Sequence, residues 1–352
     1  MQTSYWKLQK NSDNKEAMEQ AAALIKAGEV VSFPTETVYG LGADGLNPTA
    51  VAKIFAAKGR PNDNPLILHI AQKEAIAPLT TGLNANAQKL IEHFWPGPLT
   101  LIVNKSSIVP DAVSAGLETV AVRFPSNKFA QDFIRACGCP IAAPSANISG
   151  RPSPTNAQDV LEDMQGKIAG MLDGGSCGIG LESTVVDTTE PVPTILRPGG
   201  ITYEMLTEVM GAVEIDPALQ GDKNFKPKAP GMKYRHYAPK ADLSIVEGPQ
   251  EDVIDCINRL TREAAAKGLK AGIIATDETR AQYASGLVLS IGSREEEETI
   301  AHHLYEVLRD FDEADVNVIY SEAFYTPRMG QAIMNRLLKA AGHKIIKAQE
   351  EL

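Results

Sequence analysis

Five polar clusters stand where strands are predicted to end in the first two-thirds of the chain, and they are rich in cations, hydroxyls and amides. Four occupy residues 32–42, 58–65, 119–125 and 142–154, and His69 is the remaining one. Open α/β sheets hold their ligands at strand ends. Because these clusters offer few nucleophiles, they favour direct transfer between bound substrates, in which positioning and electrostatics supply the catalysis.

Motifs for two other chemistries are missing from the sequence. It contains neither a G-x-x-x-x-G-K-[ST] phosphate loop nor an H-E-x-x-H zinc motif. The four cysteines, at positions 137, 139, 177 and 256, are too few and too irregularly spaced for a disulfide framework or a zinc ribbon. This cysteine usage favours a reducing interior.

The first cluster follows a predicted buried strand at 30–33. Pro34 ends the ladder of this strand, and residues 35–37 then place two hydroxyls and a carboxylate at its end. Gly40 and Gly42 are expected to let the backbone turn sharply or approach a bound molecule closely. For this segment taken alone, an ordinary loop with turn chemistry is the alternative.

In the second cluster, Lys58 and Arg60 lie at the end of a predicted helix, and a proline-rich run fixes Asn64 just before a buried strand. A fork-shaped arginine and a point-charge lysine together suit a phosphate. The alternative is that both cations only complement the helix dipole. His69 lies within the strand that follows, either as a satisfied core residue or as a group that orients a small polar substrate.

In the fourth cluster, strand alternation sends Thr119 and Arg123 to one face. A buried arginine on a central strand needs an anionic partner. The sequence leaves two partners open, which are the carboxylate of a substrate and an internal salt bridge to Glu36 or Glu182. The fifth cluster combines small residues, hydroxyls and prolines in a stiff loop, which leaves room for a ring or a ribose.

Composition bounds the class of protein. With 352 residues, of which 43% are hydrophobic, the chain can bury the cores of two domains. A formal charge of −10 argues against a protein that mainly grips a nucleic-acid backbone. The N-terminus lacks the basic stretch and apolar run of a signal peptide, and no segment approaches membrane-spanning length, so we expect a cytoplasmic protein without a membrane partner.

Helical and strand patterns alternate along the chain, which predicts an α/β fold. The first domain, 1–210, is expected to contain a twisted, mixed sheet with helices, because several of its strands lack a helix between them. Residues 211–240 are interpreted as a linker. The second, smaller domain, 241–352, has the βαβ pattern of a Rossmann-like parallel sheet. Its strands are predicted at 243–246, 271–275, 287–290 and 316–320, and its helices at 251–267, 278–285, 295–311 and 328–341.

Several ordered motifs resemble those of the Sua5 branch of the YrdC/Sua5 family. They are Lys58-x-Arg60, Ser145-x-Asn147, FPTETVYGL at 33–41, WPGP at 95–98 and PGMKYRHYAP at 230–239. The resemblance covers essentially the whole chain. Because the shorter YrdC branch would stop near the end of the first domain, the linker and the second domain indicate Sua5. The resemblance implies a YrdC-like catalytic domain at 1–210 and a Sua5 C-terminal domain at 241–352.

Members of this family are threonylcarbamoyl-AMP synthases, which form threonylcarbamoyl-adenylate and pyrophosphate from L-threonine, bicarbonate and ATP. The resemblance implies a nucleotidyltransferase with this activity, with Mg²⁺ accompanying ATP and with no organic cofactor. The product would pass to the tRNA threonylcarbamoyl transferase complex, which forms N6-threonylcarbamoyladenosine at position 37 of tRNAs that read ANN codons. Direct tRNA binding is expected to be weak or absent.

Carried over residue by residue, the resemblance also implies a site. Lys58 and Arg60 would act in catalysis, and Arg123 would bind the carboxylate of threonine. Threonine would lie near Thr37, His69, Arg123, Ala143 and Ser183. ATP would lie near Lys58, Arg60, Asn64, Thr119, Ser145, Asn147, Ser153, Arg197 and Tyr234. No metal ligand is assigned to a protein side chain.

The linker carries Lys233, Tyr234 and Arg235 among prolines, which a mere tether would not need. Because the carbamate and the mixed anhydride decompose in water, we expect this segment to fold over the cleft as a lid. Two hypotheses of other classes stay open. The first domain could be an RNA-binding module, which the acidic total charge disfavours, and the second domain could be a regulatory or partner-binding module.

Overall fold

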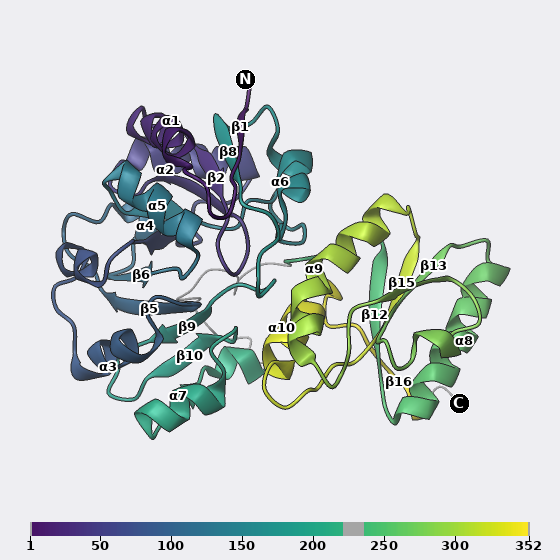
Figure 1. Cartoon of the computed structure of the whole chain (residues 1–352). Coiled ribbons are helices and arrows are strands. Elements are labelled where there is room, and N and C mark those ends of the chain that lie inside the picture. Colours follow the sequence, from purple (N-terminus) through teal and green to yellow (C-terminus); the bar gives the residue numbers. More distant parts are fainter. Residues whose placement is uncertain (1, 221–235, 351–352) are drawn as a thin grey trace. The chain divides into compact units, whose positions relative to one another are not determined.

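The structure is a computed structural model that describes residues 2–220 and 236–350. It divides into two compact units, and each is an α/β unit with its own sheet (Figure 1). Over the described residues, the first unit comprises 2–149 and 153–220, and the second comprises 150–152 and 236–350. Residues 221–235, which are half of the predicted linker and include the lid residues Lys233, Tyr234 and Arg235, lie outside the described residues.

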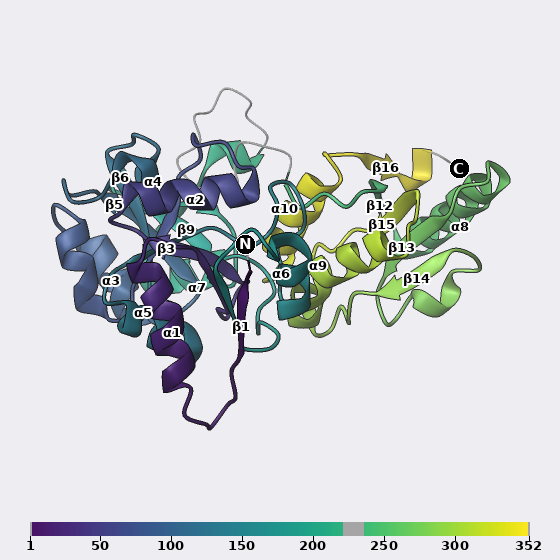
Figure 2. The same cartoon turned by 90° about the horizontal axis from the view of Figure 1, so that it is seen from above.

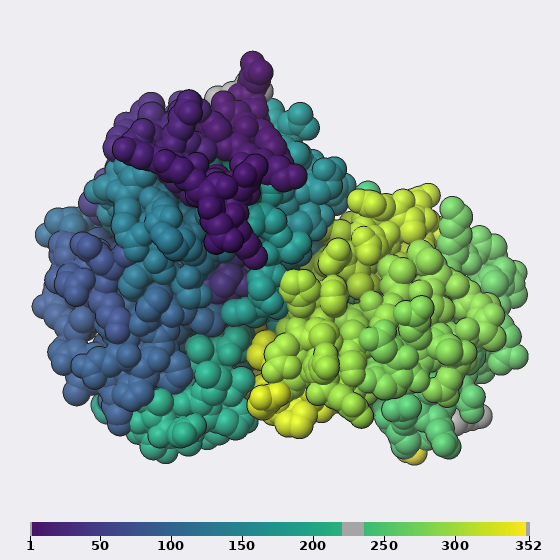
Figure 3. Space-filling model, viewed as in Figure 1, coloured from purple at the N-terminus to yellow at the C-terminus, as the bar shows by residue number. Residues whose placement is uncertain are grey.

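Within residues 2–220, the first unit forms one sheet of eleven strands. They are β1 (Ser4–Lys7), β2 (Val31–Phe33), β3 (Gly40–Asp44), β4 (Ile67–His69), β5 (Leu99–Asn104), β6 (Thr119–Arg123), β7 (Ile141–Ala143), β8 (Gly170–Asp173), β9 (Thr184–Asp187), β10 (Thr194–Arg197) and β11 (Glu214–Ile215). Their order is β1-β8-β2-β3-β7-β4-β6-β5-β9-β10-β11. Parallel and antiparallel pairs both occur, so the prediction of a mixed sheet is confirmed. The N-terminal residues, purple in Figure 3, form part of the surface of this unit, and β1 is an edge strand.

Helices cover both faces of this sheet. They are α1 (Lys15–Lys26), α2 (Pro48–Lys58), α3 (Ala85–Phe94), α4 (Asp111–Ser114), α5 (Lys128–Cys137), α6 (Ala157–Met164) and α7 (Tyr203–Met210), with 3₁₀ turns at Lys73–Leu79 and Pro217–Gln220. Asn47, Asn84, Asn127 and Asn156 cap four of these helices, since each side chain accepts a hydrogen bond from an N–H of the first turn. Gly59 ends α2 in the left-handed conformation, with φ of 61°.

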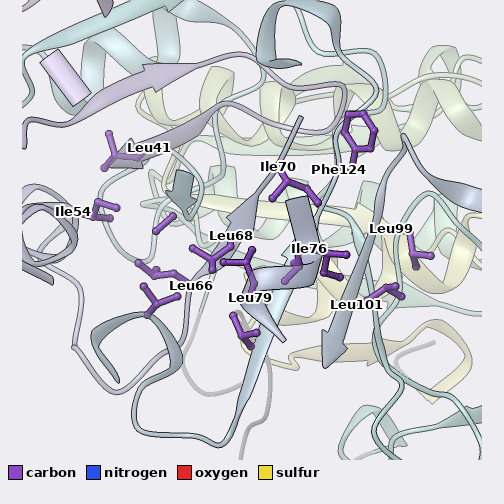
Figure 4. Packing of buried hydrophobic residues seen from close by; sticks show 14 of the residues in the cluster. Leu41, Ile54, Leu66, Leu68, Ile70, Ile76, Leu79, Leu99, Leu101 and Phe124 are labelled. Atoms are coloured by element: carbon purple, nitrogen blue, oxygen red, sulfur yellow. The ribbon is translucent and has the colours of Figure 1, made fainter. Parts of the chain in front are cut away.

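The core of the first unit has two layers, because successive strand residues face opposite sides. On one side, Val31 and Phe33 pack with the apolar faces of α1 and α5. On the other side, a larger cluster includes Leu41, Leu68 and Leu101, which Figure 4 shows among residues of neighbouring strands and of α2. Each fully buried leucine of this kind contributes about 2 kcal/mol through the removal of apolar surface from water. The strands are therefore held from both sides.

The glycines of the first polar cluster lie in a strand, which corrects the expectation of a sharp turn. β3 is antiparallel to β2 and pairs Gly42 with Val31. A Cβ atom at Gly42 would lie 2.7 Å from Cγ2 of Ile141 and 2.9 Å from Cε1 of Phe33. Glycine is therefore needed for close packing inside the protein. Gly40, Gly42 and Gly45 have G-x-G-x-x-G spacing. Because residues 40–44 form a strand, these glycines do not make a phosphate-binding turn into a helix.

The second unit is a five-stranded parallel sheet with helices on both faces, within the described residues. Its strands are β12 (Asp242–Glu247), β13 (Ala271–Ala275), β14 (Leu287–Ser290), β15 (Val318–Glu322) and β16 (Ile345–Lys347), in the order β14-β13-β15-β12-β16. Its helices are α8 (Gln250–Ala266), α9 (Glu297–Glu313) and α10 (Gly330–Ala340). Helix α8 covers one face, and α9 and α10 cover the other (Figure 2). The predicted parallel sheet is confirmed.

One predicted helix of this unit is wrong. The segment 278–285 forms only a 3₁₀ turn, Arg280–Gln282. The hydroxyls of Thr279 and Tyr283 instead donate to the buried carboxylate of Glu322. Such side-chain bonds compete with a helix for the local backbone. Among the described helices of both units, none combines the length and the apolar character needed to cross a membrane.

Candidate functional site

A row of polar side chains crosses the middle of the first sheet. Strand register places Arg123 of β6 beside His69 of β4 on one side and beside Thr100 of β5 on the other. Beyond β5, Oγ of Ser183 lies 2.7 Å from Oγ1 of Thr100. Arg197 donates from Nε to the Ser183 carbonyl at 3.0 Å and from Nη2 to its Oγ at 3.1 Å. All five side chains are buried, so the row is a polar strip withdrawn from water.

The row shares its face of the sheet with a small apolar cluster. This cluster consists of Ile67, Ile102, Ala121, Val185 and Leu196. His69 and Arg123 each stand two residues beyond a member of the cluster on the same strand, and residues two apart point to the same face. The opposite face of these strands packs in the main core. Strand alternation therefore places the polar row on one face of the sheet and sends the intervening residues of each strand into the main core on the other face.

The loop after β2 meets this row at Arg123. Nη1 of Arg123 donates to Oγ1 of Thr37 at 2.9 Å, and Nη2 lies 2.7 Å from Oε1 of Glu36. Of the two partners that the sequence left open, the internal ion pair with Glu36 is therefore present. Nε of Arg123 is buried and has no hydrogen-bond partner within the described part of the chain, whereas Nη2 is taken up by the ion pair with Glu36. The Nε–H is therefore the donor of this guanidinium that is left for an anion.

Glu36 stays ionised beside this guanidinium. Burial alone would raise the pKa of its carboxyl, but the charge and hydrogen bonding of Arg123 outweigh burial and leave that pKa below its ordinary value. Oε2 of Glu36 also accepts from the backbone N–H of Asn127 at 3.3 Å, at the start of α5. The N-terminal end of a helix favours an anion. Glu36 is thus held from two sides and keeps Arg123 paired.

His69 is a neutral member of the row. Burial, followed by the charge of Arg123, lowers the pKa of His69 to about 3. Its Nδ1 lies 3.1 Å from the carbonyl oxygen of Ile67, and its ring meets the ring of Phe33 edge-on at 6.0 Å. Both interpretations of the sequence therefore stay open, since the residue is packed in the core and also adjoins Arg123.

The neutral state of His69 predicts a pH dependence of stability. Because the folded protein disfavours the imidazolium while the unfolded chain takes up a proton near pH 6.5, stability is fully present above pH 6.5 and is lost as the pH falls. Each pH unit below 6.5 should cost about 1.4 kcal/mol, down to about pH 3. Urea unfolding at pH 6.5 and pH 4.5 should show this loss for the wild type and not for His69→Gln. His93→Gln, which changes a histidine on the surface of α3, is the matched control, and a His69→Gln profile parallel to the wild type would contradict the assignment.

Lys58 joins the second and fifth clusters. Its side chain is buried, and Nζ donates to the carbonyl oxygens of Ser145 and Asn147, both at 2.5 Å. In return the backbone N–H of Ser149 donates to the Lys58 carbonyl at 2.9 Å. Oγ of Ser145 donates to Oδ1 of Asn147 at 2.5 Å. Lys58 therefore holds the backbone of the Ser145-x-Asn147 loop, in addition to the charge that it brings to the site.

The remaining candidate residues are outside both the polar row and the Ser145-x-Asn147 loop. Nη2 of Arg60 lies 3.4 Å from the carbonyl oxygen of Asn64, whose buried Nδ2 has no hydrogen-bond partner among the residues described. Oγ of Ser153 donates to Oε1 of Glu182 at 2.6 Å. Thr119 is half-buried at the opposite end of β6 from Arg123. Ala143 lies on β7 in register with Ile67, and Tyr234 is outside the described residues.

The first loop and the Ser145-x-Asn147 loop adjoin each other. The backbone N–H of Ala146 donates to the carbonyl of Tyr39 at 2.9 Å, and Gly40 bridges to Ser145. The structure thus brings His69, Arg123, Ser183 and Arg197 into one row and bonds Thr37 to it through Arg123. Lys58 of α2 holds the neighbouring loop that carries Ser145 and Asn147. Which of these residues contact threonine and which contact ATP stays a prediction.

Thr100 is the member of the row that sequence reasoning missed. It stands in a predicted strand, and a threonine among leucines and valines is the weak signal that was available. Nothing in the sequence gives its register with Arg123 or its contact with Ser183. Within residues 2–220 and 236–350, no three His, Cys, Asp or Glu side chains gather as metal ligands.

Comparisons with known proteins agree with the motifs. A family model described as "Telomere recombination" (Sua5_yciO_yrdC) matches residues 23–199, and one described as "Threonylcarbamoyl-AMP synthase, C-terminal domain" matches residues 201–342. Threonylcarbamoyl-AMP synthase of Bacillus subtilis is 50% identical over 337 residues, which are 96% of each chain. The protein of that name from Pyrococcus abyssi is 48% identical over 327 residues, which are 93% of this chain and 94% of the relative.

A solved structure extends the likeness to the fold. The crystal structure of P. abyssi Sua5 complexed with L-threonine has a TM-score of 0.93 and 45% identity, over 98% of this chain and 99% of that chain. The similarity therefore includes both sheets. The motifs Lys58-x-Arg60 and Ser145-x-Asn147 lie within the region that the first family model matches. The chain belongs to the Sua5/YciO/YrdC family, in the Sua5 branch that carries the additional C-terminal domain.

Proposed function

We propose that this chain is an L-threonylcarbamoyladenylate synthase, a nucleotidyltransferase of the cytoplasm. It combines L-threonine, bicarbonate and ATP into threonylcarbamoyl-AMP and releases pyrophosphate. The product is the donor for N6-threonylcarbamoyladenosine at position 37 of tRNAs that read ANN codons, and the tRNA threonylcarbamoyl transferase complex consumes it. Family membership supports this proposal, as do the names of the two relatives that match this chain over more than nine-tenths of its length.

The observation that carries the proposal is the unused Nε–H of Arg123. This donor is buried and has no acceptor in the described ranges, while Nη1 of the same guanidinium donates to the hydroxyl of Thr37. An α-carboxylate is an anion that such an N–H binds, and the adjacent hydroxyls suit the amine or hydroxyl of a small amino acid. A relative in the same family was crystallised with L-threonine, which supports threonine as that amino acid.

The proposed reaction has two steps. The amine of threonine takes up carbon dioxide from bicarbonate to give a carbamate, and a carbamate oxygen then attacks the α-phosphorus of ATP as the bond to pyrophosphate breaks. Mg²⁺ enters with ATP as part of the substrate and neutralises charge on the phosphates. Phosphate oxygens would be the main ligands of that ion, because the side chains of the candidate site are mostly cationic or carry hydroxyls and offer few carboxylates. Lys58, Arg60 and Arg197 are the cations that we assign to the nucleotide.

The proposal predicts strict dependence on every substrate. Pyrophosphate release, measured with Mg·ATP, should need both L-threonine and bicarbonate and should fall to background when either is omitted. Arg60→Ala should lower the rate by about 10²-fold, because a cation is removed from the developing charge on the phosphates. Pyrophosphate release that does not depend on threonine would overturn the assignment.

A further inference from the structure

The hydroxyls of Thr100 and Ser183 together carry two hydrogens, but the described residues offer an acceptor for only one of them. Neither side chain is more than 1% exposed. Oγ1 of Thr100 has a single hydrogen-bond partner among the described residues, which is Oγ of Ser183 at 2.7 Å. The two hydroxyls carry two hydrogens, and only one of them can lie between the two oxygens. The other hydrogen has no acceptor in the described part of the protein.

Arg197 biases which hydroxyl keeps that hydrogen. Its Nη2 donates to Oγ of Ser183, so Ser183 already acts as an acceptor. When Thr100 also donates, both lone pairs of the Ser183 oxygen are used, and the hydrogen of Ser183 is the one left without an acceptor among the described residues. Ser183 lies just before β9, outside the strand ladder, whereas Thr100 lies within β5 between β6 and β9. The spare hydrogen therefore belongs to Ser183.

The hydroxyl of Thr37, in the first loop, is an acceptor, whereas that of Ser183 is a donor. Oγ1 of Thr35 donates to the carbonyl of Val38 at 2.6 Å, so its single hydrogen is used. A hydrogen bond at the 2.9 Å contact between Thr35 and Thr37 therefore uses the hydrogen of Thr37, on the Thr35 oxygen, which also receives the backbone N–H groups of Thr37 and Val38 at the longer distances of 3.2 and 3.3 Å. Oγ1 of Thr37 accepts one hydrogen bond from Arg123, which leaves one lone pair and no hydrogen. Thr37 can thus offer only an acceptor.

We propose that Thr100 is a positioning residue that fixes Ser183 as a hydrogen-bond donor for an anionic oxygen of the substrate. The inference rests on the proposed function for the identity of that substrate. The Thr100 and Arg123 positions are paired across β5 and β6, so the Ser183 donor and the unused Nε–H of Arg123 serve the same face of the site. Together they match a carboxylate, while Thr37 matches a group that donates. The row is therefore complementary to a zwitterionic hydroxy amino acid in one orientation.

A double-mutant cycle tests the role of Thr100. Ser183→Ala should raise the KM for threonine about tenfold or more, as expected for the loss of a hydrogen bond to a charged group. Thr100→Val, which keeps the shape of the side chain, should raise it about three- to tenfold and leave the KM for ATP within about twofold. In the Ser183→Ala background, Thr100→Val should have no further effect on the KM, because Thr100 acts through Ser183. Thr100→Ser should restore wild-type values.

Stability gives a second and independent readout. Ser183→Ala strands the buried hydroxyl of Thr100, so it should lower Tm, and adding Thr100→Val should raise Tm again by removing that stranded donor. Thr188→Val is the matched control, since it removes a buried hydroxyl that bonds to the carbonyl of Ile102, two residues further along β5. It should leave the KM for threonine within about twofold.

The outcomes separate this proposal from the proposed function. Thr100→Val that still raises the KM in the Ser183→Ala background would overturn the positioning role, because Thr100 would then contact the substrate itself. An unchanged KM in the Thr100→Val single variant would overturn it as well. Calorimetric titration with L-threonine alone measures the same cycle without turnover. It therefore decides the role of Thr100 even where pyrophosphate release proves independent of threonine.

Discussion

Arg123→Met should abolish measurable threonine binding and lower kcat/KM for threonine by about 10²- to 10³-fold. The side chain is buried on a strand that is paired on both sides, and its Nε is a donor without a partner in the described structure. Truncating one member of a buried, hydrogen-bonded charge pair costs about 2–5 kcal/mol in binding. Calorimetry with L-threonine and the rate of pyrophosphate release both measure the effect. The KM for ATP should change far less.

The same substitution should also destabilise the fold, for a separate reason. It leaves the carboxylate of Glu36 buried without its counter-ion, which costs about 3–5 kcal/mol. Arg123→Met combined with Glu36→Gln removes the stranded charge, so this double variant should recover most of the lost Tm without recovering threonine binding. Arg123→Lys keeps the positive charge but lacks the planar guanidinium with its several fixed N–H donors. It should therefore lower Tm only slightly and lower the affinity for threonine more strongly. A double variant that binds threonine as tightly as the wild type would contradict the role of Arg123.

Much of the fold could be predicted because burial leaves its mark on the sequence. Strand β13, Ala271–Ala275, was predicted with its observed bounds, since it is a short run of β-branched or small apolar residues. Strand β3 was not, because its glycines favour a turn when the chain is considered locally. Only the packing of Ile141 and Phe33 against Gly42 explains why glycine stands in a strand.

The candidate site could be predicted as a set of residues and less well as a set of contacts. Strand alternation placed Arg123 on one face, and the need for a buried counter-ion named Glu36 among the alternatives. The register that brings Thr100 beside Arg123 depends on pairing between distant segments, which one sequence does not encode locally. The helix predicted at 278–285 failed in the same way, because its hydroxyls bind Glu322, a residue more than thirty positions away.

Lys58→Met should raise the KM for ATP by about 10- to 100-fold while leaving the affinity for threonine within about twofold. The ammonium of Lys58 ties down the carbonyl oxygens of Ser145 and Asn147, and its loss leaves both without this donor. An unmade hydrogen bond to a buried group costs about 1–3 kcal/mol. The threonine row is joined to this loop only indirectly, through contacts such as that between Tyr39 and Ala146. Pyrophosphate release over a range of ATP concentrations and calorimetry with threonine give the two values.

Two variants decide whether Lys58 acts through this loop or through its charge. Lys53→Met is the matched control on the same helix, because Lys53 pairs with Glu29 at a partly exposed site and should leave the kinetics unchanged. Lys58→Arg keeps the positive charge, but its planar guanidinium does not replace one ammonium between two carbonyls in a closed space. If the loop is what matters, Lys58→Arg should resemble Lys58→Met in its KM for ATP. If it instead restores the KM, and Lys58→Met lowers only kcat, the ammonium acts on the charge of the transition state and not on the loop.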